Sequence, residues 1–287
     1  MSTGQKANRT AKATRTTKAK RAGRKAKHSP VLDHAVRLGL VCFGVVHLLI
    51  AWLAGQLALG HHAGQASGSG ALSELAQKPF GQILLWVVAV GFFALVLWQA
   101  AEALLRHDED GAKLAVKKVG SAGKAVIYAV LGVSALKIAL GGGSSSGGSG
   151  GSTDTLTARL MSMPGGQLIV GAIGIGILVV AAAHVYKGFT EDFRDKMNIR
   201  GNTGTSGRVY VALGMVGYVA KGVALSVVAG LFCWAAATHD PQKSGGLDQA
   251  LKTVLDQPFG SPLLLVIAVG LACYGLFCFA WARHLDH

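Results

Sequence analysis

Six apolar stretches of about twenty residues or more constrain the fold of this chain more than any other feature. They run roughly over residues 36–58, 81–105, 119–140, 165–188, 212–236 and 261–283. Because a helix rises about 1.5 Å per residue, each stretch can cross the ~30 Å hydrocarbon core of a bilayer. Only 15% of the 287 residues are charged, whereas a soluble domain carries about a quarter. The sequence therefore predicts an all-α integral membrane bundle of six transmembrane helices.

A repeated proline motif divides the six stretches into three pairs. Pro79, Pro164 and Pro258 open the even-numbered stretches, and glycines follow two and twelve residues after each proline. These glycines are Gly81, Gly91, Gly166, Gly176, Gly260 and Gly270. The odd-numbered stretches align more weakly on Gly39, Gly120 and Gly217. Proline suits the first turn of a helix, and glycine within a membrane lets helices approach closely. We therefore expect three tandem two-helix hairpins, with the six glycines serving helix packing.

The repeats give a simple division of the chain. We expect a disordered polybasic tail over residues 1–30 and repeats over 31–110, 111–200 and 201–287, with a flexible Gly/Ser loop at 141–152. A short amphipathic segment precedes each proline, most clearly "LDQALKTVL" before Pro258 and more weakly "ALSELAQ" and "TLTARLMSM". We expect these segments to be short helices on the membrane surface, and a plain loop is the alternative.

Basic residues predict the orientation in the membrane. Residues 1–29 hold ten Lys or Arg and no acidic residue, and the segments that follow the second and fourth stretches are also basic. The positive-inside rule then places both termini in the cytoplasm. The tail lacks the short apolar core and cleavage site of a signal peptide. We expect it to contact anionic lipid headgroups. Nucleic acid could use the same charges, but no aromatic or fold signal supports that partner.

Three short motifs in the odd-numbered stretches resemble a known family. They are "FGVVH" from Phe43 to His47, "KAVIY" from Lys124 to Tyr128 and "KGVAL" from Lys221 to Leu225. Together with the proline motif and the basic tail, they resemble the bacterial membrane family catalogued as domain of unknown function, number twelve hundred and six. The resemblance covers about residues 33–285, and the first unit departs from the pattern with Phe43 in the basic position. It implies six spans in three repeats in a bacterial cell membrane, and no particular activity.

Four ionisable residues within or near the spans are candidates for a polar site. Lys124 and Lys221 lie four residues after Gly120 and Gly217, and Glu102 and Lys187 hold equivalent places near the cytoplasmic ends of the second and fourth stretches. Ionisable groups in a membrane are costly and are often functional. We therefore predict a site for an anionic headgroup or a small anion. The alternative is that the lysines extend to the headgroup region independently, with one ordinary ion pair.

The histidines and cysteines do not predict a cofactor or metal site. His47 and His184 differ in depth by about 9 Å at 1.5 Å per residue, so we expect no haem between them. His47 aligns with Tyr128, which favours an interhelical hydrogen bond. His61 and His62 are adjacent without further ligands. The cysteines all fall in apolar runs, as core residues do: Cys42, Cys233, Cys273 and Cys278.

Motifs of the common hydrolases and nucleotidases are missing from the sequence, which contains no G-x-S-x-G, H-E-x-x-H or Walker loop. The sequence thus leans against an enzyme without deciding the matter. We expect a scaffold or accessory protein that binds lipid, a small ligand or a protein partner. A transporter or channel for a small solute or ion is the alternative, although all three repeats share one orientation, unlike the inverted repeats of many transporters. A closed apolar axis would favour the scaffold, and a polar cavity reaching mid-membrane would favour transport.

Overall fold

A computed structural model of the chain describes residues 30–61, 64–105, 111–141, 157–197 and 203–284. Six of its helices are long and apolar enough to cross a membrane. They are α2 (Pro30–Ala58), α4 (Gly81–Leu105), α5 (Gly111–Ala139), α7 (Gly166–Thr190), α9 (Gly204–Thr238) and α11 (Gly260–Arg283). Because these helices coincide with the six apolar stretches, the predicted fold class is confirmed.

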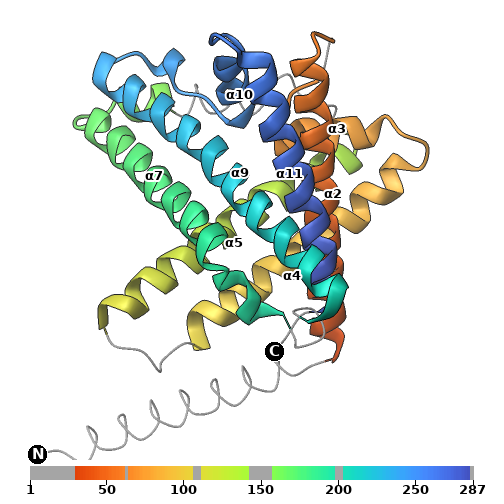
Figure 1. The fold of residues 1–287 in the computed structure, drawn as a ribbon. Helices are drawn as coiled ribbons and strands as arrows, with labels where there is room; N and C mark the ends of the chain where they lie inside the picture. The colour runs from red at the N-terminus through yellow and green to blue at the C-terminus, as the bar shows by residue number, and fades with distance from the viewer. Residues whose placement is uncertain (1–29, 62–63, 106–110, 142–156, 198–202, 285–287) are drawn as a thin grey trace, which may run out of the picture.

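The long helices alternate in direction and so give the bundle two distinct ends (Figure 1). Helices α2, α5 and α9 begin at one end, where α4, α7 and α11 finish; we call it the basic end. The three prolines lie at the opposite end, which we call the proline end. The first and last long helices therefore both reach the basic end, as an even number of spans requires. The cytoplasmic location of this end stays a prediction.

Short helices before the prolines match the amphipathic segments. They are α3 (Gly68–Ala76), a helix over residues 157–161 and α10 (Leu247–Leu255). The prediction of short helices is confirmed, and their contact with a membrane surface stays a prediction. One buried carboxylate joins two of the repeats here: Asp248 of α10 accepts a hydrogen bond from the backbone N–H of Ala66 (2.8 Å), and its other oxygen lies 2.8 Å from Nζ of Lys252.

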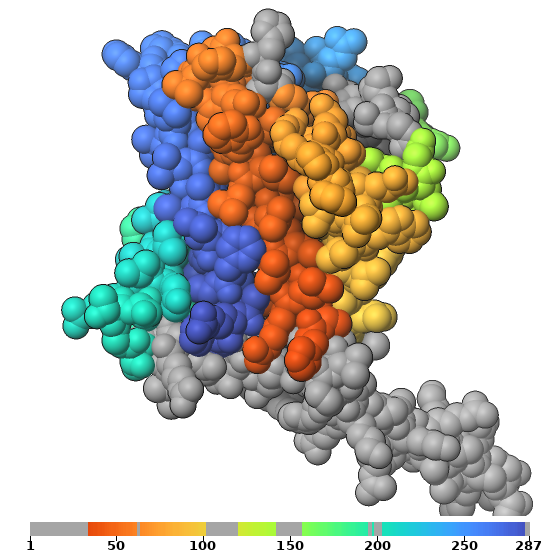
Figure 2. All heavy atoms as spheres, turned by 90° about the vertical axis from the view of Figure 1, so that its right-hand side faces the viewer, coloured from red at the N-terminus to blue at the C-terminus, as the bar shows by residue number. Residues whose placement is uncertain are grey.

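The helices pack in a cyclic order across the repeats. Each even-numbered span packs extensively on the odd-numbered span of another repeat: α4 on α5, α7 on α9, and α11 on α2. Figure 2 shows one part of this order, with α2 between α11 and α4. Two glutamines, each three residues after its proline, make matching bonds: Gln82 Nε2 donates to the carbonyl of Ala139 (3.0 Å), and Gln167 Nε2 donates to the carbonyl of Ala236 (2.6 Å). The repeats are therefore interlocked rather than separate.

The second repeat differs from the other two in its internal packing. Helices α2 and α4 pack on each other, as do α9 and α11, but among the described residues α5 and α7 make at most marginal contact. Only 22% of the apolar window of α5 and 17% of that of α7 is buried, against at least 39% in the other four spans. The contacts among the six helices thus follow a ring that is interrupted between α5 and α7.

The glycines twelve residues after each proline also differ in packing between the second repeat and the other two. A Cβ built on Gly91 would lie 3.1 Å from Sγ of Cys42 and 3.2 Å from Cα of Gly39, and one built on Gly270 would overlap the Cβ of Ala220. Around Gly176 no described atom lies within 4 Å of such a Cβ. The packing predicted for Gly176 is therefore wrong. In the first and third repeats this glycine packs on the odd-numbered span of the same repeat, whereas in the second repeat α5 lies apart from α7.

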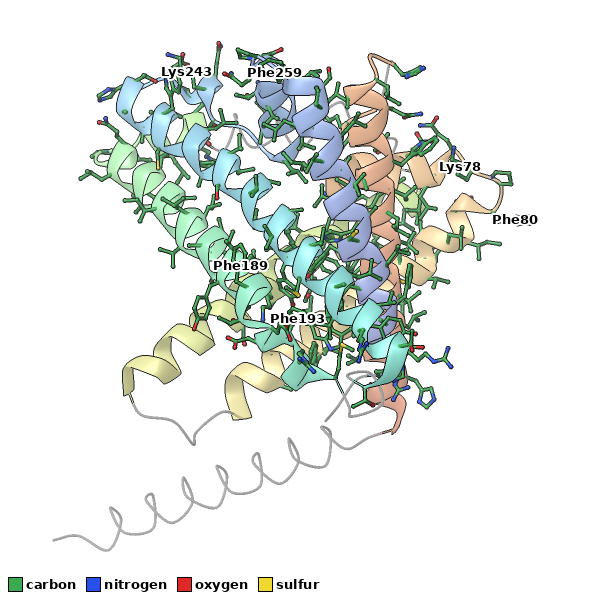
Figure 3. The ribbon with its side chains drawn as sticks, in the orientation of Figure 1. Lys78, Phe80, Phe189, Phe193, Lys243 and Phe259 are labelled. Atoms are coloured by element: carbon green, nitrogen blue, oxygen red, sulfur yellow. The ribbon has the colours of Figure 1, made fainter. Side chains whose placement is uncertain are left out.

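The glycines two residues after each proline pack within the turn that precedes the span. A Cβ on any of them would overlap a carbonyl oxygen at the end of the preceding short helix. The pairs are Gly81 with Leu75, Gly166 with Leu160 and Gly260 with Leu255. The residue before each glycine has a positive φ, which is 62° at Phe80, 75° at Gly165 and 60° at Phe259. The proline motif therefore builds a sharp turn, whose two phenylalanines point away from the bundle (Figure 3).

Candidate functional site

Lys221 of α9 lies at the centre of the bundle, half-buried between three helices. Its Nζ is 3.3 Å from Nε2 of His47 on α2. The other ring nitrogen of His47, Nδ1, is 2.9 Å from the carbonyl oxygen of Phe43. A nitrogen that faces a carbonyl must donate, so Nδ1 carries the proton and Nε2 accepts from the lysine. The interhelical hydrogen bond predicted for His47 is confirmed, with a lysine as its partner.

Two aromatic rings complete the surroundings of the Lys221 ammonium group. Its Nζ lies 4.2 Å from the ring centroid of Tyr274 on α11 and 4.8 Å from that of Phe43 on α2. Both distances fall within the ~6 Å range of a cation–π interaction. Within the described part of the chain, no ion pair forms at Lys221. Rings and an imidazole therefore stabilise this charge in place of a described carboxylate.

A second histidine lies on α7, three residues before Lys187. His184 of α7 has its ring centroid 5.7 Å from that of Tyr218 on α9, and its Nδ1 lies 2.8 Å from the carbonyl oxygen of Val180. The spacing places Lys187 on the same side of α7 as His184, and Lys124 of α5 and Lys187 are both half-buried. A single site formed by these two lysines and Lys221 stays a prediction. The Glu102 side chain lies outside the described residues.

Packed aromatic side chains lie around Lys221. We use the name lysine cluster for the predicted group of Lys124, Lys187 and Lys221. The ring of Phe43 lies 5.3 Å from that of Tyr128 on α5 and 6.3 Å from that of Phe92 on α4. The ring of Tyr218 lies 5.3 Å from that of Tyr274. All five of these rings are buried. The centre of the bundle is therefore filled by rings from five different spans.

Phe193 covers this centre from the basic end. It belongs to the short 3₁₀ helix η1 (Asp192–Lys196), which follows α7, and it is only 1% exposed. Its ring is stacked on that of Tyr218 at 5.3 Å and lies 5.1 Å from that of Phe277. Figure 3 shows Phe193 at the lower part of α9, with Phe189 on α7 nearby. The sequence analysis missed Phe193 because it lies in a segment whose basic residues indicated a loop.

Gln99 of α4 is a second residue that the sequence analysis missed. Its side chain is 2% exposed, and its Oε1 has no hydrogen-bond partner among the described residues. A buried polar atom without a partner is rare and often marks a functional site. Gln99, His184 and Cys278 each lie twenty residues after the proline of their repeat. Comparing this position across the repeats would have drawn attention to Gln99.

Metal binding finds no support among the described residues. No group of three or more His, Cys, Asp or Glu side chains there is placed to hold a metal ion. The four cysteines are free thiols, and Cys42 and Cys278 are buried. The site is thus basic and aromatic in character.

The fold and this site together define a multi-pass membrane protein of three interlocked two-span repeats around a basic and aromatic centre. Comparison with known sequences gives the particular family: the chain belongs to the family described as Domain of Unknown Function (DUF1206), which matches residues 38–106, 119–191 and 216–284. The predicted family resemblance is confirmed, with one match in each repeat. The chain is also 30% identical over 266 residues to "Uncharacterized protein YxxB" of Bacillus subtilis (strain 168), covering 88% of this chain and 91% of that protein. No solved structure matches the chain.

Proposed function

We propose that this protein is a non-catalytic, accessory membrane protein that holds a small anion or an anionic headgroup at the lysine cluster. One observation carries the proposal: the Lys221 ammonium lies inside the bundle against His47, Phe43 and Tyr274, without an ion pair in the described part of the chain. The basic tail of residues 1–30 would hold the same protein against an anionic lipid surface.

The energetics favour a bound anion. A lysine at the centre of a membrane span costs about 2.5–3.5 kcal/mol on insertion scales. A cation–π contact returns about 0.5–2 kcal/mol, so the two rings come near to balancing the charge of Lys221 alone. An anion beside Lys221 would offset the cost that the rings leave, whereas a purely structural role would be met by an apolar residue, as the first repeat shows with Phe43.

Packing at the centre favours binding over conduction. A transport path along the axis of the ring would have to pass the buried rings of Phe43, Tyr128 and Tyr274 and then Phe193. The contacts between these rings support a fixed internal site more than a continuous path. A transporter remains the alternative function, and it would require these rings to move apart.

Binding of inorganic phosphate tests the proposal directly. The purified protein in nanodiscs of zwitterionic lipid is titrated with phosphate and followed by ³¹P NMR, and native mass spectrometry identifies any anion or lipid that is retained. Lys221→Met should lower anion binding at least tenfold. The control is Lys137→Met, because Lys137 is exposed in the last turn of α5 at the proline end. Equal retention of anions and lipids by wild type and Lys221→Met would contradict the proposal.

A further inference from the structure

We infer that the ligand of the lysine cluster is an anionic phospholipid that enters sideways between α5 and α7. This inference rests on the proposed function and names the class of ligand. Three observations carry it: the interruption of the ring, the amphipathic stripes beside it, and the cations at the same end of both stripes.

The interruption occurs where the repeat pattern provides for a helix contact. In the first repeat, a Cβ on Gly91 would lie 3.1 Å from Sγ of Cys42, which is three residues after Gly39. The corresponding residues of the second repeat are Gly176 and Gly123, and around each of them no described atom lies within 4 Å of a built Cβ. The second repeat thus keeps small residues for a close contact that the structure leaves open. Among the described residues, no side chain or helix fills the place that helix packing fills in the other two repeats.

An amphipathic stripe runs along α7 beside this space. Ile173, Ile177, Val180, His184 and Lys187 follow one another at intervals of three or four residues, which places them on one side of the helix. Ile173 is 37% and Val180 46% exposed, and His184 and Lys187 are partly exposed. The stripe is therefore basic toward the basic end and apolar toward the proline end.

Helix α5 carries a stripe of the same polarity. Lys124 lies toward the basic end, and Ile127, which is 54% exposed, and Leu131 follow it at intervals of three and four residues. Ile127 lies four residues after Gly123, and Val180 lies four residues after Gly176, so each stripe borders the open position on its own helix. Both helices thus carry a cation toward the basic end and apolar surface beyond it.

A phospholipid matches this arrangement better than other occupants. Its phosphate would meet the lysines, and its acyl chains would cover Ile127, Ile173 and Val180. A free anion would occupy only the basic part of the stripes and would leave their apolar part to bulk lipid. A second copy in a two-fold dimer would place two identical sets of cations opposite each other, and these like charges would repel.

Lipid retention is the first test. The protein is purified in detergent with phosphatidylglycerol or phosphatidylcholine, and native mass spectrometry measures the lipid-bound fraction. We expect selective retention of phosphatidylglycerol, reduced at least tenfold by Lys124→Met, Lys187→Met or Lys221→Met and unchanged by Lys137→Met. Val180→Trp should also reduce it, because the indole would fill the space. Ile175→Trp is the matched control, since Ile175 is 59% exposed on another side of α7. Each variant must elute as a monodisperse species. Lys221→Arg, which keeps the positive charge, should retain the lipid as the wild type does.

Cross-linking is the second test. A Gly123→Cys/Gly176→Cys pair, in a background with the native cysteines replaced by alanine, would form a disulfide only if α5 and α7 pack as α2 and α4 do. The control is Gly91→Cys with Cys42 retained, whose 3.1 Å separation from Sγ to the built Cβ suits a disulfide. In phosphatidylglycerol nanodiscs we expect the control to cross-link and the Gly123/Gly176 pair to stay reduced.

Four outcomes would overturn the inference. Glycerol phosphate that binds as tightly as the lipid, with no effect of Val180→Trp, would leave the anion site but exclude the lateral lipid. Binding of neither probe through the lysines would exclude the proposed function as well. Full cross-linking of the Gly123/Gly176 pair in phosphatidylglycerol would mean that no lipid separates the helices. A doubled mass without bound lipid would assign the space to a second copy.

Discussion

Phe43 and Lys221 hold the same position in the first and third repeats, and the Lys221 ammonium group lies over the Phe43 ring at the centre of the bundle. The Lys221 Nζ lies 4.8 Å from the centroid of the Phe43 ring. A third lysine in place of Phe43 would add a positive charge beside Lys221 and remove one of the two rings that stabilise it. The departure of the first repeat from the basic pattern therefore helps to accommodate the lysine of the third.

A double-mutant cycle tests the interaction between Phe43 and Lys221. Phe43→Leu should destabilise the wild type by about 1 kcal/mol more than it destabilises Lys221→Met, because the cation–π contact exists only when both residues are present. Equilibrium unfolding in mixed micelles provides the free energies. Phe92→Leu is the control, since the Phe92 ring packs on Phe43 at 6.3 Å and should give additive effects with Lys221→Met. An equal cost of Phe43→Leu in both backgrounds would remove the interaction.

Two glycines on α7 form a matched pair for testing the packing order. Gly174→Leu should lower the melting temperature by several degrees, because a Cβ there already lies 2.8 Å from Sγ of Cys233 on α9. Gly176→Leu should leave it unchanged, because no described atom lies within 4 Å of a Cβ at that position. Thermal unfolding in detergent gives the comparison. A reversed order of the two effects would mean that α7 is rotated relative to α9.

Two phenylalanines near the basic end form another matched pair. Phe193→Ala should destabilise the protein by roughly 3 kcal/mol, since it empties a buried position between Tyr218 and Phe277. Phe189→Ala should be nearly neutral, because Phe189 is 70% exposed. Chemical denaturation of both variants in the same detergent measures the difference. Similar small effects would show that Phe193 does not cover the centre.

The carboxylate that joins α10 to the first repeat should contribute to stability. Asp248→Ala leaves the backbone N–H of Ala66 without its acceptor, at a cost of about 1–3 kcal/mol. Asp256→Ala, one residue beyond the same helix and exposed, is the control. Melting temperatures of the two variants should separate by several degrees. If they coincide, the bond between α10 and the first repeat contributes nothing measurable.

Membrane orientation follows from the basic segments and is tested by labelling intact cells. In a background without native cysteines, a membrane-impermeant maleimide should label Lys243→Cys, which lies at the proline end, without permeabilisation. Asp192→Cys, at the basic end, should react only after the membrane is opened. Labelling of Asp192→Cys in intact cells would reverse the orientation.

Local features of the chain determined the number, length and repetition of the helices. Six apolar stretches predicted six spans, because each helix must satisfy its own backbone and cover its own length of hydrocarbon. The proline motif predicted where the even-numbered spans begin, since proline at the first turn and the left-handed residue after it act over a few residues. Equivalent places in the repeats also indicated Lys124 and Lys221. All of these features depend on neighbours close in the sequence.

Tertiary structure alone decided which helices contact one another. Nothing local distinguishes Gly176 from Gly91, yet the first faces open space and the second packs on α2. The bond between His47 and Lys221 joins residues 174 positions apart, and Phe193 enters the bundle from a segment that looks like a polar loop. These contacts depend on how whole helix faces fit together. In a membrane, where apolar side chains are equally well solvated by lipid, that fit of shape and polarity selects the partner.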